Sequence, residues 1–398
     1  MLRVMSLSFC ICVGILGIEY PLKSIGLALA DSKPSIPAQS KQLLESTSGI
    51  QSYQAQISPL LKAKIHKREN LVIRVLGDSH IAGDFLSHRL RNLLFKNYSF
   101  GLLYPLYPLY HQHIALKYQS QNFEILNSRI NEPTAYPLGG VIAKPTALPA
   151  YITLSPINPT NATTKIIFKA PDTKAALRIE DSAKAKFIIN AKRASSWQIL
   201  SMELQYPISI YALNEKVLLG GMYITQRNGG NNIVESLGIN GARSDIWLKW
   251  DRELFMQQMR ILPADLYILC YGSNDAMHDN FNESVFIKHY GELIDNIREA
   301  NPNTTILLLS PPPVVQKTTK GKRVVYKKSK NANITARAIT KLAKEKQTLL
   351  FSMEDFINQS GGKAKWESAN LAKPDVHLLP NGYKLIADKL YYELLRLK

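Results

Sequence analysis

Hydrophobic residues at two different spacings divide this chain into regions of different structure. Between residues 53 and 110, and again from 231 to 398, short apolar runs alternate with segments whose apolar residues recur every three or four positions. The first pair is the run 71–76 followed by an amphipathic segment over 81–94. Buried strands that alternate with amphipathic helices predict a doubly wound α/β domain with a mostly parallel sheet.

The elements expected in this α/β domain can be placed along the chain. Strands are predicted at 71–76, 233–237, 266–269, 306–309 and 348–351, and helices at 57–65, 81–94, 246–259, 286–297, 334–342 and 381–397. Chemistry in such folds gathers at the carboxyl ends of the parallel strands. The loops after these strands are therefore where candidate functional residues are sought.

The region 111–230 has a different texture, because short β-branched and aromatic runs alternate there with turn residues. The runs are 151–154, 165–168, 176–179, 186–189, 208–211 and 217–225. Many short strands at even spacing predict an all-β sandwich. Since this block interrupts the α/β pattern, it is expected to be an inserted domain.

The first 30 residues have the pattern of a secretory signal peptide. An early arginine precedes an apolar stretch, and Ala28-Leu29-Ala30 fits a cleavage site. An uncleaved anchor is the alternative, although the apolar run is short for a membrane span. The polar segment 31–52 is predicted to be a linker. Cys10 and Cys12 fall within the signal, and Cys270, which ends an apolar strand, is expected to be buried for packing.

The balance of 49 basic and 31 acidic residues gives a net charge of +18. Nucleic acid is a common partner for such a charge, but an exported enzyme rarely meets it. An anionic polymer of the cell envelope or a membrane surface is a more suitable partner, and a general enrichment in lysine remains an alternative. The densest basic run, 317–330, indicates a solvated hairpin rather than a DNA-binding helix.

Three segments offer side chains for acyl transfer. Ser79 lies between the strand 71–76 and the helix 81–94, where it could act as a nucleophile if a base takes its proton, or could simply cap the helix. Gly241 and Asn274 each follow an expected strand and could donate to a developing oxyanion, although either could also belong to an ordinary turn.

A histidine near the C-terminus supplies the missing base. His377 lies just before the last helix, with Asp375 beside it to orient the ring. His111 and His113 have no clustered acidic partners, so they are expected to be surface or packing residues rather than metal ligands. The whole set predicts a serine esterase.

These segments resemble the four sequence blocks of the SGNH (GDSL-type) hydrolases. The matching positions are Gly77-Asp78-Ser79, Gly241, Asn274 and Asp375-x-His377. The resemblance implies a three-layer α/β/α flavodoxin-like fold and catalysis without a metal or cofactor. It also implies the roles of the residues: Ser79 as nucleophile, His377 as base, Asp375 as triad acid, and an oxyanion hole from Ser79 N–H, Gly241 N–H and the Asn274 side chain.

The sequence departs from the family pattern in two places. The usual spacing of the acid and the base is Asp-x-x-His, whereas Asp375 is only two residues before His377, and Pro374 occupies the earlier position. His80 stands where leucine is usual, and no role is assigned to it.

The signal, the basic charge and the β-rich insert together resemble the periplasmic peptidoglycan O-acetylesterases of Gram-negative bacteria, whose insert is similar to a carbohydrate-binding module. This resemblance implies a periplasmic enzyme that removes acetyl from the C-6 hydroxyl of N-acetylmuramic acid in O-acetylated peptidoglycan. An O-acetyltransferase with the same triad, a general exported lipase or esterase, and a non-catalytic wall-binding protein remain alternatives.

Overall fold

A computed structural model describes residues 38–131, 135–158, 160–227, 230–320 and 323–397. The expected signal peptide, with Cys10 and Cys12, lies outside these residues. Within the described ranges, no helix is long and apolar enough to cross a membrane.

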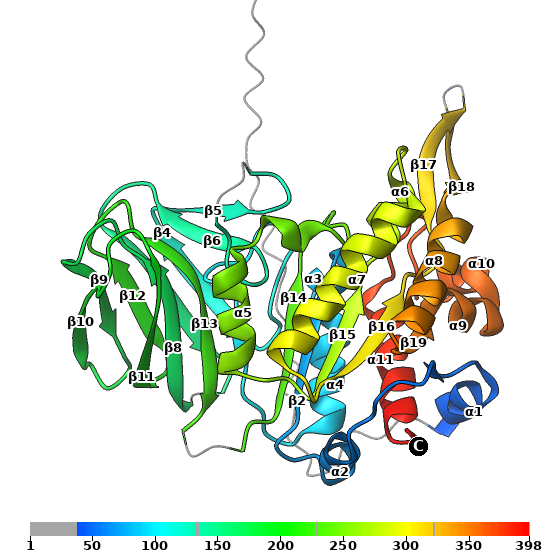
Figure 1. Ribbon diagram of the computed structural model, residues 1–398, viewed down its shortest axis with the longest axis horizontal. Helices are drawn as coiled ribbons and strands as arrows, with labels where there is room; N and C mark the ends of the chain where they lie inside the picture. Colours follow the sequence, from blue (N-terminus) through cyan, green and yellow to red (C-terminus); the bar gives the residue numbers. More distant parts are fainter. Residues whose placement is uncertain (1–37, 132–134, 159, 228–229, 321–322, 398) are drawn as a thin grey trace, which may run out of the picture. The chain divides into compact units, whose positions relative to one another are not determined.

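The central sheet has five parallel strands in the order β14-β2-β15-β16-β19. They are β2 (Val72–Gly77), β14 (Ile233–Gly238), β15 (Leu266–Cys270), β16 (Thr305–Ser310) and β19 (Leu349–Ser352). Counted along the chain, this order is 2-1-3-4-5, which is the flavodoxin-like order (Figure 1). All five strands predicted for the α/β domain are confirmed, and so is the predicted fold class.

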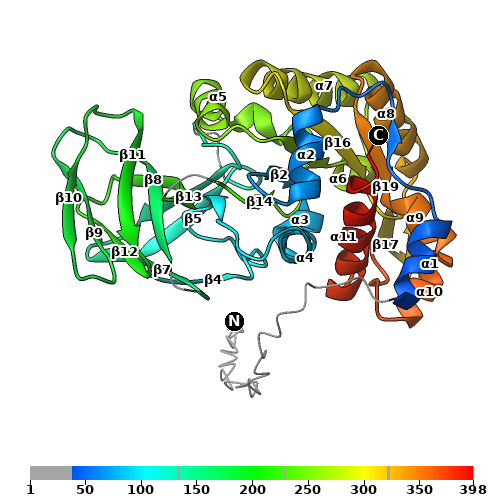
Figure 2. The same cartoon turned by 90° about the horizontal axis from the view of Figure 1, so that it is seen from below.

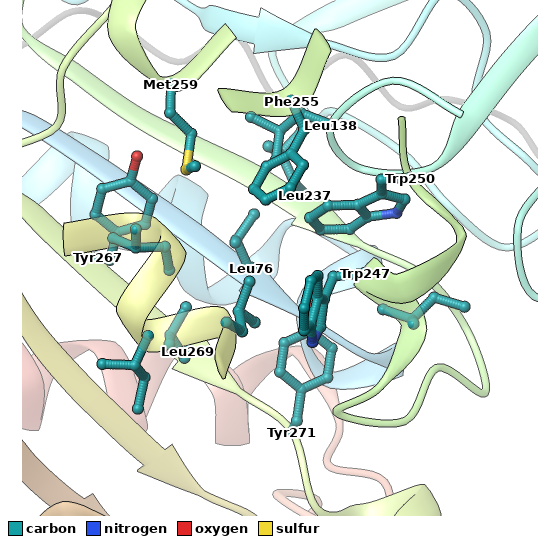
Figure 3. Packing of buried hydrophobic residues seen from close by; sticks show 14 of the residues in the cluster. Leu76, Leu138, Leu237, Trp247, Trp250, Phe255, Met259, Tyr267, Leu269 and Tyr271 are labelled. Atoms are coloured by element: carbon teal, nitrogen blue, oxygen red, sulfur yellow. The ribbon is translucent and has the colours of Figure 1, made fainter. Parts of the chain in front are cut away.

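Helices cover both faces of the sheet because side chains alternate along each strand. On β2, Ile73 and Val75 pack with α4 (Phe85–Leu94) and α11 (Pro380–Leu394). Val72 and Leu76 point to the other face, which is covered by α5 (Arg252–Ile261), α7 (Glu283–Ala300) and α8 (Ala332–Glu345). Figure 2 shows these two helical layers, and Figure 3 shows the aromatic packing of the second one.

Six further helices are short. They are α2 (Pro59–Lys67), α3 (Ser79–Ala82), the 3-10 helix η1 (Ile246–Lys249), α6 (Ser273–Met277), α9 (Met353–Gln359) and α10 (Gly362–Ser368). The helix predicted over 81–94 is broken between α3 and α4 by Asp84, which has φ +61° and forms a buried ion pair with Arg91. This pair gives the break a fixed geometry.

The inserted domain is a sandwich of two antiparallel sheets. One has the order β10-β9-β12-β7-β4 and the other β11-β8-β13-β6-β5, with β3 also paired to β13. The strands are β3 (Gly101–Leu103), β4 (Leu116–Gln121), β5 (Phe123–Asn127), β6 (Val141–Pro145), β7 (Ala150–Pro156), β8 (Asn161–Lys169), β9 (Ala175–Glu180), β10 (Lys186–Asn190), β11 (Trp197–Gln205), β12 (Ile208–Ala212) and β13 (Leu218–Gln226). Because β3 belongs to a sheet of the sandwich, the sandwich begins before the predicted start at residue 111.

The described part of the segment 31–52 is not the linker that its polar composition suggested. Residues Ala38–Ser46 form α1, and Gln51–Ser52 form β1, which pairs antiparallel with β19. Leu44 is fully buried, and the buried ammonium of Lys389 donates to the Leu44 and Thr47 carbonyl oxygens. The C-terminal helix α11, which carries Lys389, therefore holds this segment in place.

Candidate active site

Three neighbouring strands bring the candidate residues to one edge of the sheet. Gly77 at the end of β2 lies opposite Gly238 of β14 and Cys270 of β15. A Cβ atom at Gly238 would lie 2.4 Å from the Ala82 backbone nitrogen, so only glycine lets α3 pack against this strand. The loops that carry Ser79, Gly241 and Asn274 therefore leave the sheet side by side.

Ser79 is the first residue of α3, and its hydroxyl is turned toward the base. Asp78 is the N-cap, because its Oδ1 accepts the His80 N–H at 3.0 Å. The serine is therefore not the capping residue. Its Oγ lies 3.0 Å from His377 Nε2, which is the distance needed for proton transfer between a hydroxyl and an imidazole.

The loop before α11 brings Asp375 and His377 together in spite of their close spacing. Asp375 Oδ1 accepts the His377 backbone N–H at 2.8 Å and lies 3.1 Å from His377 Nδ1. Lys363 Nζ closes the turn by donating to the Lys373 and Asp375 carbonyl oxygens. A carboxylate on Nδ1 favours the tautomer that carries its proton there, which leaves the Nε2 lone pair for Ser79.

The Asn274 amide lies between the Gly241 loop and Asp78, the residue before the serine. Its Nδ2 donates to the Ala242 carbonyl oxygen at 2.9 Å and makes a longer contact of 3.4 Å with Asp78 Oδ2. Burial, together with the nearby Asp275 carboxyl, raises the pKa of Asp78 to about 8. Asp78 is therefore mostly neutral at pH 7 and is a weak competitor for the amide hydrogen.

Two backbone donors complete this group. The N–H groups of Ser79 and Gly241 have no hydrogen-bond acceptor among the described residues. Gly241 has φ +76°, a conformation that few residues other than glycine adopt. With the Asn274 amide, these groups could donate to one oxygen atom next to Ser79 Oγ.

His80, for which the sequence suggested no role, is a buried structural residue. Its Nδ1 lies 2.9 Å from the Tyr383 hydroxyl, and its Nε2 lies 2.8 Å from Ser273 Oγ. Burial, and to a smaller extent the neighbouring His377, lowers the pKa of His80 to about 3. The ring is therefore neutral and adds no positive charge beside His377, whose ring centroid is 5.8 Å away.

His111 was expected to be a surface or packing residue, and in the structure it is half-buried and bonded to two backbone groups. Its Nε2 accepts the backbone N–H of Asn240 at 3.1 Å, and its Nδ1 donates to the Leu109 carbonyl oxygen at 3.0 Å. Arg129 Nε donates to the Gly241 carbonyl oxygen at 3.0 Å. Both residues come from the insert and hold the loop that carries Gly241. His113 is buried against Phe100, in agreement with a packing role.

A cavity of about 290 Å³ adjoins this edge of the sheet. At its base Asp275 accepts the Ser244 N–H and hydroxyl, and burial raises the pKa of Asp275 to about 6. Phe281, Phe286 and His289 form part of its wall. Asp275 follows Asn274 in α6, so the same short helix carries the amide donor and a residue of the cavity lining.

Such an arrangement can carry out acyl transfer. A hydroxyl within reach of an oriented imidazole is an activated nucleophile, and convergent N–H groups stabilise the negative oxygen of a tetrahedral intermediate. The His377 and Asp375 side chains are 36% and 41% exposed. Substrate and water can therefore reach the centre from solvent.

Comparisons with known proteins agree with this description. Residues 221–385 match the GDSL-like Lipase/Acylhydrolase family, and residues 99–209 match the N-terminal region of peptidoglycan O-acetylesterase. A solved structure of a peptidoglycan O-acetylesterase is 25% identical, covers 87% of this chain and 99% of its own, and superposes with a TM-score of 0.74.

A second solved structure, a family two carbohydrate esterase from Cellvibrio japonicus, is 10% identical and covers 71% of this chain and 97% of its own. It superposes with a TM-score of 0.29. The comparison with curated proteins gave no match.

Proposed function

We propose, from its membership of the GDSL-type (SGNH) hydrolases, that this chain is a serine esterase that removes O-acetyl groups from peptidoglycan. The observation that carries the proposal is the hydrogen-bonded series from Ser79 through His377 to Asp375, with the Asn274 amide in contact with Asp78, the residue before the serine. The same series would be needed for any acyl transfer. The choice of substrate therefore rests on the inserted domain.

In the first step, Ser79 Oγ attacks the carbonyl carbon of the acetyl ester while His377 Nε2 takes the hydroxyl proton. Asp375 holds the Nδ1–H and stabilises the imidazolium that forms. The C–O bond to the sugar then breaks, and His377 returns the proton to the departing sugar oxygen. The products of this step are a free sugar hydroxyl and acetyl-Ser79.

The carbonyl oxygen becomes negative during the attack, and three donors are available to it. They are the N–H groups of Ser79 and Gly241 and the second amide hydrogen of Asn274. That hydrogen must leave its 3.4 Å contact with Asp78, which costs little because the contact is long and the carboxyl is neutral. Loss of one donor of this kind typically costs about 3–4 kcal/mol of transition-state stabilisation.

Water completes the cycle. A water molecule gives its proton to His377 Nε2 and attacks acetyl-Ser79. As the intermediate collapses to acetate, His377 returns the proton to Ser79 Oγ and the free serine is restored. The exposure of His377 and Asp375 gives water access to the acyl-enzyme. Because the neighbouring His80 ring stays neutral, it does not repel the imidazolium that forms on His377.

The insert supports peptidoglycan as the substrate. The match to the N-terminal region of peptidoglycan O-acetylesterase lies over 99–209, which is most of the sandwich, and the similar solved structure covers both domains. Residues of the insert also hold the Gly241 loop, through His111 and Arg129. The acetyl group on the C-6 hydroxyl of N-acetylmuramic acid is the proposed site of cleavage.

This substrate places the enzyme outside the cytoplasm, and the pattern of residues 1–30 supports export to the periplasm. Acetate release from O-acetylated peptidoglycan, measured beside release from short and long acyl esters, tests the proposal. A preference for long acyl chains would indicate a lipase instead. Transfer of acetyl to added glycan, in preference to water, would indicate an acetyltransferase.

A further inference from the structure

The hairpin of β17 (Val315–Lys320) and β18 (Arg323–Lys328) has an unusual charge. Over residues 315–330 the sequence contains no acidic residue, and its basic residues are Lys317, Lys320, Lys322, Arg323, Lys327, Lys328 and Lys330. Figure 1 shows this hairpin projecting beyond α6 and α8. A two-stranded ribbon of one charge is costly to keep together, because like charges repel across the strands.

One face of the hairpin combines positive charge with apolar surface. The register pairs Lys317 with Tyr326, Thr319 with Val324, and Val315 with Lys328. Val324 is 51% exposed and Tyr326 is 40% exposed, and Lys317 and Lys328 are exposed beside them. We name the residues Lys317, Val324, Tyr326 and Lys328 the hairpin face. An exposed aromatic ring between cations is suited to a ligand with both flat apolar surface and negative charge.

Several of these cations have no acidic partner within the protein. Lys328 is paired with Glu354 at 2.8 Å, and Lys330 with Asp279 at 3.1 Å. No carboxylate among the described residues forms an ion pair with Lys317, Arg323 or Lys327. The positive field of the hairpin is therefore largely uncompensated and extends into solvent.

The root of the hairpin is attached to both halves of the active site. Ser329 Oγ donates to the Ala276 carbonyl oxygen at 2.6 Å, and Gln316 Nε2 donates to the Met277 carbonyl oxygen at 2.9 Å. Both acceptors belong to α6, the helix that carries Asn274. Val314 also packs in one apolar cluster with Ala276 and with Val376, the residue between Asp375 and His377. The hairpin is therefore anchored to the two elements that carry Asn274 and His377.

We propose that the hairpin face is a binding site for the peptidoglycan polymer, in which Tyr326 packs against a sugar ring and Lys317 attracts carboxylates of the peptide side chains. This inference rests on the proposed function for the identity of the polymer. An anionic phospholipid surface would also be complementary to the positive charge of the hairpin. The position of the hairpin root, on α6 and on the Asp375–His377 loop, favours the substrate over a membrane.

The test measures binding without turnover. Two proteins are sedimented with purified peptidoglycan sacculi. The parent carries Ser79→Ala only, and the hairpin variant carries Ser79→Ala together with Lys317→Gln and Tyr326→Ala. Lys67→Gln is the matched control, because Lys67 is an exposed lysine on α2, which leads into the opposite end of β2. The hairpin variant should bind at least about fivefold more weakly, equivalent to about 1 kcal/mol, and the control should bind as the parent does.

Two further readouts make the test specific. Sacculi whose carboxylates have been converted to amides should bind the parent more weakly. The difference in affinity between the parent and the hairpin variant should then be smaller. In the Ser79 background, the hairpin variant should hydrolyse p-nitrophenyl acetate normally. Equal binding of parent and hairpin variant to sacculi would overturn the proposal. The proposal would also be overturned if the hairpin variant bound sacculi as the parent does but bound phosphatidylglycerol vesicles more weakly than the parent. Because binding is measured with an inactive serine, this result does not depend on whether peptidoglycan is deacetylated.

Discussion

Asn274 Nδ2 lies 3.4 Å from Asp78 Oδ2 and 2.9 Å from the Ala242 carbonyl oxygen, so in the resting enzyme both amide hydrogens face protein acceptors. The strong contact fixes the amide, and the long contact leaves one hydrogen that an oxyanion can capture. How easily it is captured depends on the charge of Asp78. A neutral carboxyl competes weakly, and an ionised one competes strongly and also repels the developing negative charge.

The charge of Asp78 should set an alkaline limit on activity. Its pKa is raised to about 8, chiefly by burial, so the carboxyl is protonated below that pH and ionises above it. We expect kcat on p-nitrophenyl acetate, corrected with the Ser79→Ala protein, to fall as the pH rises through about 8. Asp78→Asn cannot ionise and should remove that fall while keeping an acceptor for the His80 N–H. Parallel pH profiles for the two proteins would assign the alkaline limit to another group.

His111 should act as a positioning residue for the oxyanion loop. Replacement by leucine removes the acceptor for the Asn240 N–H, and we expect kcat to fall about tenfold with KM little changed, since a displaced donor weakens mainly the transition state. His111→Gln, which can restore an acceptor, should recover part of the loss. A loss in KM alone, or equal loss in both variants, would contradict this role.

Asp375 should contribute both by orienting His377 and by its charge. The His377 N–H and Nδ1 both contact the same oxygen, Oδ1. Asp375→Asn keeps the geometry but removes the charge and can favour the wrong tautomer of His377, so it should lose about 10⁴-fold in kcat. Asp375→Ala removes both hydrogen bonds as well and should lose a similar amount, about 10⁴-fold. If alanine cost less than tenfold, another group would have to orient His377.

Buried neutral histidines should make the fold sensitive to acid. Burial lowers the pKa of both His80 and His113 to about 3, whereas an unfolded histidine titrates near 6.5. Below pH 6.5 the unfolded chain binds the proton first, so stability is lost as the pH falls toward 3. Each histidine then costs about 1.4 kcal/mol per pH unit.

His113 offers the cleaner variant because neither ring nitrogen has a hydrogen-bond partner. Urea unfolding of the wild type and of His113→Leu at pH 7, 6, 5 and 4 measures the effect. The variant should show a shallower fall in the free energy of unfolding below pH 6.5. An unchanged slope would show that His113 is charged or hydrated in the folded protein.

The sequence was sufficient to predict the strands of the central sheet and the motifs that directly follow them. The strands β2, β14 and β15 are continuous apolar runs because both of their faces are buried, and that pattern is visible without a structure. Each is followed by a polar motif. The strand order then brings these motifs to one edge, which explains why residues far apart in the chain could be grouped beforehand.

Features that depend on distant partners were not predictable. Helix α1 is polar, but Leu44 is buried in an apolar cluster with residues such as Leu390, and Lys389, from the opposite end of the chain, donates to its carbonyl oxygen. His111 bonds to Asn240, which lies 129 positions later, and nothing near His111 indicates that contact. The strand β5 has no fully apolar face to mark it, since four of its five residues are only partly buried.

The most direct test of the account is acetate release from O-acetylated peptidoglycan by the wild type and by Ser79→Ala. The account predicts rapid release by the wild type. For the variant it predicts a loss of about 10⁴-fold or more in rate with unchanged thermal stability, because the nucleophile is removed and nothing else in the structure is disturbed. Release by Ser79→Ala at a rate near that of the wild type would contradict the account, and so would a wild type that cleaves small acetyl esters but leaves acetylated peptidoglycan intact.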